Sequence, residues 1–207
     1  MNQRTLSIIA GVSYLVIFFL AIYANFFVLD AILQDPLGTI EQNSMHVRFG
    51  ALAFLVAAVF DVIVAWALYE LYKGNILSRL STYFRIIHAV IMGVAVFALP
   101  LTLTLTADEA ILNQVTIFNT MWLIGLFFFG VHLILLGRIV KHIRIIPWIL
   151  MLAGVMYIVD TGAHFLLPHY ETYADLFLMA VAIPAIFGEM SFSLWLLFKG
   201  EKSTASN

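Results

Sequence analysis

The last two apolar stretches of the chain carry residues that are suited to chemistry. Asp160 and His164 are four residues apart and Tyr157 precedes Asp160 by three, so the three side chains share one face of a helix. A carboxylate beside an imidazole can orient the ring or join it in binding a metal ion. Glu189 lies in the middle of the next stretch, five residues after Pro184, which can bend a helix beside the acid. Acidic groups in such apolar surroundings indicate a partner or a function.

The composition places these residues in a membrane protein. The chain has 207 residues, of which 63% are hydrophobic and 11% are charged. Apolar runs of about 20 residues predict transmembrane helices, and these runs do not alternate as barrel strands do. The net charge of −2 and the lack of a basic stripe argue against a nucleic-acid partner, and the lack of cysteine excludes cysteine ligands and disulfides. We therefore expect one domain, residues 1–207, that is an all-α integral membrane bundle with the lipid bilayer as its partner. The six predicted spans are Leu6–Leu29, His46–Tyr72, Ser81–Thr106, Gln114–Arg138, Pro147–Pro168 and Asp175–Lys199.

Lys and Arg gather on one side of these spans. The second and fourth loops and both ends of the chain are basic, whereas the other three loops carry Asp and Glu. Cytoplasmic loops are enriched in Lys and Arg, so we expect both termini in the cytoplasm, and aromatic anchors such as Trp148 and Trp195 gather on the same side. The basic residues of this side are Arg4, Lys73, Arg79, Arg138, Lys141, Arg144, Lys199 and Lys202.

Ionisable residues of four spans are predicted to form an inner polar layer. With a rise of 1.5 Å per residue, Asp61 and Glu189 lie roughly 21–22 Å from the outer end of their spans, His88 and His132 roughly 27 Å, and Arg85 about 31 Å. We expect Arg85 to pair with Asp61 or Glu189. A divalent metal site is an alternative, since two histidines and two carboxylates are common ligands. Its ligands would be His132, Glu189, Asp61 and His88.

A second polar layer is predicted near the outer surface. His46, Arg48, Asn25 and His164 lie within about 6 Å of the outer edge, and Asp160 lies near 12 Å. We expect an ion pair between Arg48 and Asp160 that links the second and fifth spans. Histidine pairs on different helices can hold haem axially, although a c-type attachment is excluded because the chain has no cysteine. Haem is the least favoured cofactor here.

Short motifs spread over nearly the whole chain identify a family resemblance. They are Arg48-Phe49-Gly50, Phe84-Arg85, Gly130-Val131-His132, Leu136-Gly137, Tyr157-Ile158-Val159-Asp160 and Gly188-Glu189. In these motifs the chain resembles the bacterial membrane family of domain of unknown function 4386. The resemblance implies six helices in a bacterial inner membrane and no particular activity. A looser similarity links the chain to membrane hydrolases of the alkaline-ceramidase type, which hold zinc with histidines and an aspartate but have seven spans.

Three functional hypotheses fit a polar interior of this kind. In the first, a polar intramembrane cavity binds or moves a small ligand, ion or proton. Asp160 and Glu189 would exchange the proton, because burial and a neighbouring arginine act in opposite directions on a carboxylate. Arg48 and Arg85 would be counter-ions, and His132 a relay or ligand. The second is a membrane-embedded metal-dependent hydrolase, which needs a metal-activated water. The third is a structural or accessory membrane subunit, whose polar pairs only hold helices together. The candidate ligand- or proton-binding residues are Arg48, Asp61, Arg85, His132, Tyr157, Asp160, His164 and Glu189.

Overall fold

The chain folds into helices that are long enough to cross a membrane. The computed structural model describes residues 1–140 and 143–200, so Lys141 and Lys202 of the predicted basic side lie outside the described residues. Within those two ranges no β-strand occurs, and six helical stretches have the length and apolar composition of a span. The all-α, six-span prediction is therefore confirmed. The stretches are Gln3–Gln34, Ser44–Tyr72, Ile76–Thr102, Asp108–Ile139, Ile146–Leu166 and Tyr170–Phe198.

The helix ends differ from the predicted ends where the sequence supplies caps and breaks. α5 (Ile76–Ala95) begins five residues before the predicted span because the side chain of Asn75 accepts a backbone N–H of its first turn. α6 (Ala98–Thr102) continues the same span after a short break, since Pro100 cannot donate a hydrogen bond to the preceding turn. α7 (Asp108–Ile139) begins six residues early, and its first turn carries two acidic residues that the helix dipole stabilises.

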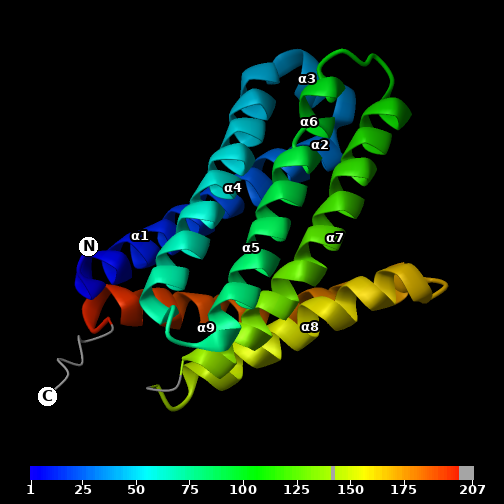
Figure 1. Cartoon of the computed structure of the whole chain (residues 1–207). Coiled ribbons are helices and arrows are strands. Elements are labelled where there is room, and N and C mark those ends of the chain that lie inside the picture. The colour runs from blue at the N-terminus through cyan, green and yellow to red at the C-terminus, as the bar shows by residue number, and fades with distance from the viewer. Residues whose placement is uncertain (141–142, 201–207) are drawn as a thin grey trace, which may run out of the picture.

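The long helices form a closed ring. Each packs against the next in the order α1, α4, α5, α7, α8 and α9, and α9 returns to α1 (Figure 1). The remaining bounds of these helices are α1 Gln3–Ile22, α4 Ser44–Tyr72, α8 Ile146–Leu166 and α9 Ala174–Phe198. The connecting elements are a π-helix Tyr23–Leu29, α2 Asp30–Gln34, α3 Pro36–Gln42 and a 3₁₀-helix Tyr170–Tyr173.

Polar contacts close the ring between the first and last helices. The guanidinium of Arg4 donates to the backbone carbonyl of Leu196 at 3.1 Å and to that of Leu197. These carbonyls belong to the last turn of α9, where the helix dipole favours a cation. Ser193 Oγ donates to the carbonyl of Gly11 at 2.9 Å. The beginning of α1 and the end of α9 are thereby held together at one end of the molecule.

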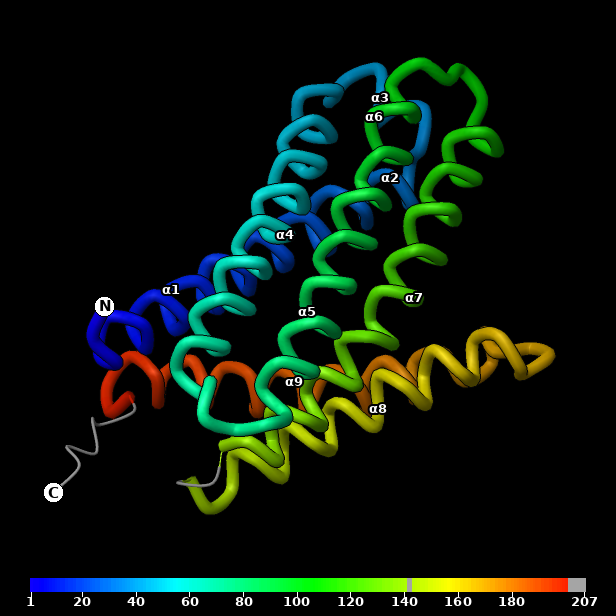
Figure 2. The backbone as a smooth tube through the Cα atoms, viewed as in Figure 1, coloured from blue at the N-terminus to red at the C-terminus, as the bar shows by residue number. Residues whose placement is uncertain are grey.

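The α8–α9 hairpin joins the other helices at one end only. α7 and α8 touch closely where Gly130 meets Gly154, because a Cβ on Gly130 would lie 2.6 Å from the carbonyl oxygen of Gly154. Beyond that point the hairpin runs away from the far ends of α4, α5 and α7 (Figure 2). Among the described residues, the apolar core at those far ends has members from α4 through α7 and from the α1–α3 stretch, but none from α8 or α9.

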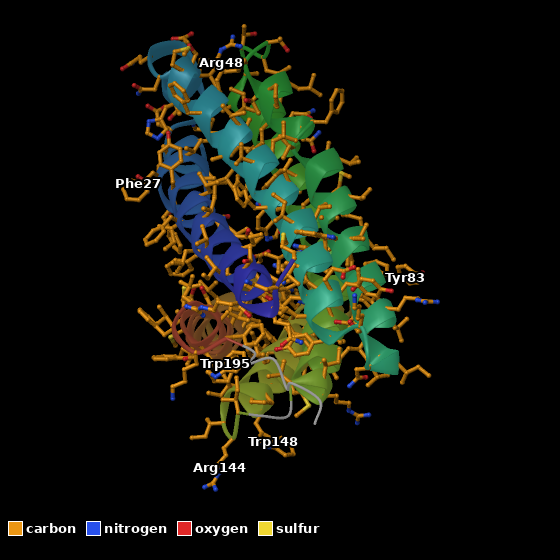
Figure 3. The ribbon with its side chains drawn as sticks, turned by 60° about the vertical axis from the view of Figure 1, so that its left-hand side comes forward. Phe27, Arg48, Tyr83, Arg144, Trp148 and Trp195 are labelled. Carbon is orange, nitrogen blue, oxygen red and sulfur yellow. The ribbon has the colours of Figure 1, made fainter. Side chains whose placement is uncertain are left out.

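Aromatic and basic side chains mark one end of the molecule. Trp148, Trp195 and Arg144 lie together at the end opposite to Arg48 (Figure 3). Trp148 is 71% exposed, as expected for an aromatic anchor at a membrane surface.

Candidate functional site

Arg85 is the centre of a buried polar cluster. Its side chain on α5 is 1% exposed, and its Nη2 donates to Oδ1 of Asp61 on α4 at 2.5 Å. Nη1 donates to the hydroxyl of Tyr14 on α1 at 2.7 Å and lies 3.2 Å from Nε2 of His132 on α7. Of the two ion pairs predicted for Arg85, the one with Asp61 is formed. We call Tyr14, Asp61, Arg85 and His132 the Arg85 cluster; it joins four helices of the ring.

Both ring nitrogens of His132 have partners. An arginine can only donate, so Nε2 of His132 must accept from Arg85 and Nδ1 must carry the proton. Nδ1 lies 3.0 Å from the carbonyl oxygen and 2.9 Å from the hydroxyl of Ser81, which can both accept. His132 is therefore a neutral acceptor for Arg85, held in orientation by Ser81. This arrangement leaves neither nitrogen free for a ligand.

Aromatic rings complete the surroundings of Arg85. The guanidinium carbon lies 4.6 Å from the ring centroid of Tyr14 and 5.1 Å from that of Phe129. Cation–π contacts of this kind stabilise a desolvated guanidinium. His88, one turn along α5, approaches the other oxygen of the same carboxylate: its Nε2 lies 3.7 Å from Oδ2 of Asp61. Asp61 thus faces both Arg85 and His88.

The predicted metal site is not assembled. Its ligands were to be His132, Glu189, Asp61 and His88. In the described part of the chain, no three or more His, Asp or Glu side chains gather in an arrangement that could hold a metal ion. The physical reason is Arg85, whose guanidinium lies between Asp61 and His132 and supplies the positive charge that a metal would bring.

A cavity lies inside the helix ring beside the Arg85 cluster. Its volume is about 180 Å³, and residues of α1, α4, α5, α7, α8 and α9 line it. We call it the inner cavity. Most of its wall is aliphatic or aromatic, and Phe54, Trp122 and Leu126 belong to this apolar part. Its titratable lining residues are Tyr14, Asp61, Arg85, His88, Tyr157 and Glu189.

Glu189 differs from the other charged residues of the inner cavity. Its side chain on α9 is half-buried, and it forms no hydrogen bond or ion pair within residues 1–140 and 143–200. Arg85 and Asp61 line the same cavity as Glu189. Because Arg85 is already paired with Asp61, Glu189 adds a carboxylate that no cation in this part of the chain contacts. Tyr157 on α8 also lines the cavity, packed edge-on against Phe129.

The outer polar residues do not pair as predicted. Arg48 lies exposed at the beginning of α4 (Figure 3), and its expected ion pair with Asp160 is not formed. The hydroxyl of Tyr170 donates to Oδ1 of Asp160 at 2.6 Å instead, and the ring of His164 packs edge-on against that of Tyr170 at 4.6 Å. His46 stacks on Tyr23 near the other outer ends. The α8–α9 hairpin diverges from the outer end of α4 and so separates Asp160 from Arg48 (Figure 2). This divergence explains why the predicted ion pair is wrong.

Sequence analysis missed two residues of the Arg85 cluster and its support. Tyr14 and Ser81 are uncharged, so neither stands out in the sequence as a partner for a buried charge; Ser81 opens the third predicted span, and Tyr14 lies well inside the first. The signal that could have found Tyr14 is its depth on the first span, which matches the depths of Asp61 and Glu189 on theirs.

Comparison with known proteins gives a family but no activity. The model of the family described as "Domain of unknown function (DUF4386)" matches residues 9–200, which confirms the resemblance inferred from the motifs. A protein of Archaeoglobus fulgidus described as "Uncharacterized protein" is 31% identical over 160 residues, which cover 74% of this chain and 85% of that protein. No solved structure matches the chain.

Proposed function

This chain belongs to the family described as Domain of unknown function (DUF4386), and we propose that it binds a small ligand, ion or proton in the inner cavity, with Glu189 as the binding group. The six apolar helices are those of a multi-pass membrane protein. We further propose that it lies in the cytoplasmic membrane with both termini in the cytoplasm. The exposed positions of Lys73, Arg79, Arg138 and Arg144 support this orientation.

The unpaired state of Glu189 is the observation that carries the proposal. A carboxylate in apolar surroundings is costly unless it is neutralised or hydrogen-bonded. Asp61 is neutralised by its ion pair with Arg85. Among the described residues, no side chain neutralises Glu189 or hydrogen-bonds to it. Binding a proton, a cation or the positive part of a ligand would supply what Glu189 lacks. The charged and titratable groups that share the cavity with it are Tyr14, Asp61, Arg85, His88 and Tyr157.

The same observation separates this function from the other two hypotheses. A structural subunit explains the Arg85 cluster, whose members satisfy one another and join four helices. It does not explain an unpaired acid beside a cavity. A hydrolase needs a metal and a water activated by it, and the residues described here bring no such ligand set together. Asp160 is bonded to Tyr170 and does not line the inner cavity, so we assign it no part in binding.

Proton exchange at Glu189 can be observed by infrared difference spectroscopy of the protein in lipid. On acidification we expect the C=O band of a protonated carboxyl in apolar surroundings, because no group of the described residues hydrogen-bonds to the Glu189 side chain. The band should disappear in Glu189→Gln and persist in Glu171→Gln, which removes an exposed carboxylate just before α9. A band that persists unchanged in Glu189→Gln would refute Glu189 as the exchanging group.

A further inference from the structure

We propose that the ligand of the inner cavity is a lipophilic ammonium, a protonated amine on a single apolar chain, which enters from the bilayer between α1 and α9. This inference rests on the proposed function, and it names the chemical class that the site would take. Three features carry it: the mouth of the cavity, its charge, and its size.

We place the mouth of the inner cavity between the first and last helices. α1 and α9 touch where Ser193 meets Gly11, and from there they diverge (Figure 1). Cavity-lining residues follow this contact on both helices, with Phe18 on α1 and Ile186 on α9. Ile186 lines the cavity and is also 47% exposed, so the cavity reaches the lateral surface of the molecule there. In a membrane this surface faces lipid, and a ligand dissolved in the bilayer would meet it directly.

The charges of the inner cavity favour a cation over an anion. Asp61 and Glu189 are two carboxylates against one guanidinium, and Arg85 already uses Nη1 and Nη2 on Tyr14, His132 and Asp61. Of the three guanidinium nitrogens, only Nε lacks an acceptor within the described ranges, and a single guanidinium that already pairs with Asp61 does not offset a second carboxylate. An ammonium can instead donate to Glu189. The aromatic faces of the cavity wall add cation–π attraction.

The size and wall of the cavity favour a molecule with an apolar tail. A volume of about 180 Å³ holds a head group and the first carbons of a chain, and is smaller than the pockets that enclose whole drug-sized ligands. The rest of an alkyl chain would therefore pass out through the mouth into lipid. Phe18, Ile186 and Met190 would line its path with apolar surface.

Tryptophan fluorescence can test this ligand class in zwitterionic lipid nanodiscs. The four tryptophans include Trp122 in the cavity wall, so a variant with Trp66→Phe, Trp148→Phe and Trp195→Phe reports from the cavity alone. The probes are dodecylammonium, the neutral dodecanol, the anionic dodecanoate and the short, water-soluble butylammonium. Each is titrated into this reporter protein, into the reporter with Glu189→Gln, and into the reporter with Glu70→Gln. Glu70 is the matched control, because its carboxylate pairs with Lys73 outside the cavity.

We expect a saturable response of Trp122 to dodecylammonium that is weaker by about tenfold or more in Glu189→Gln and unchanged in Glu70→Gln, as for a lost charge-assisted hydrogen bond. An equal response to dodecanol or dodecanoate would overturn the ammonium class, and equally tight binding of butylammonium would overturn entry from the bilayer. No response to any amine would overturn the inference as a whole. The infrared band of Glu189 decides separately whether the proposed function stands, so the two failures can be told apart.

Discussion

Replacing Arg85 with methionine should lower the free energy of unfolding by about 3 kcal/mol or more, because breaking a buried ion pair from one side leaves the other charge uncompensated. Asp61 would lose its hydrogen bond at 2.5 Å in a site where it is 5% exposed. Tyr14 and His132 would lose their shared donor as well. Interhelical hydrogen bonds between neutral side chains in membrane bundles are often worth less than about 3 kcal/mol, whereas Arg85 and Asp61 are both charged. Thermal or denaturant unfolding in one fixed detergent measures the difference.

Two further variants make this result specific to the pair. Arg79→Met removes an exposed arginine from the same helix, so it should change stability little. Asp61→Leu combined with Arg85→Met removes both charges and should recover most of the stability that Arg85→Met loses. If Arg79→Met and Arg85→Met were equally mild, or if the double variant were no better than the single one, the Arg85 cluster would not hold the ring together.

Adding one methyl group at Gly154 should destabilise the fold by about 1–3 kcal/mol, the usual cost of overpacking. A Cβ there would press into the carbonyl oxygen of Gly130 and lie 2.9 Å from Cγ1 of Ile134, and backbone atoms of α7 cannot move aside cheaply. Gly154→Ala is therefore expected to unfold at lower temperature than the wild type. It should also loosen the whole α8–α9 hairpin, which limited proteolysis of its connecting loop would detect.

Gly162→Ala is the matched control for this prediction. Gly162 lies on the same helix, and a Cβ there would meet no atom within 4 Å. Because alanine is the better helix former, this variant should be neutral or slightly more stable. Equal effects of Gly154→Ala and Gly162→Ala would mean that the close approach of α7 and α8 does not determine the stability of the hairpin.

The sequence predicted the spans and part of the Arg85 cluster for a simple reason. Long apolar runs leave few ways to satisfy the backbone in lipid, so the six helices follow from hydropathy. Depth along each span then placed Asp61 and Arg85 in one layer, and the structure joins them. Glu189 belongs to the same layer and lines the same cavity, but depth does not reveal which of the two acids Arg85 chooses.

The contacts that sequence analysis did not predict depend on which face each helix presents to its neighbours and on how the helices tilt. Arg48 and Asp160 share a predicted outer layer, but the α8–α9 hairpin diverges from the other helices. Tyr170, in the connection between α8 and α9, donates a hydrogen bond to Asp160 instead. The hairpin packs on α7 at the close contact of Gly130 with Gly154, and one sequence does not reveal which glycines meet in this way. The π-helix that continues α1 is another local feature that was not predicted. Within it, the side-chain amide of Asn25 donates to the backbone carbonyl of Ala21 at 2.9 Å.

Modification by dicyclohexylcarbodiimide, an apolar reagent that reacts with protonated carboxyl groups in lipid-accessible sites, tests the central claim most directly. The protein is treated in vesicles, and the extent of modification is measured at each acidic residue by peptide mass spectrometry. We expect Glu189 to be modified and Asp61 to remain unmodified, because Glu189 lines an open cavity without a partner, whereas Asp61 is buried in an ion pair with Arg85. An unmodified Glu189, or an Asp61 modified just as fast, would contradict the division between a binding acid and a structural acid.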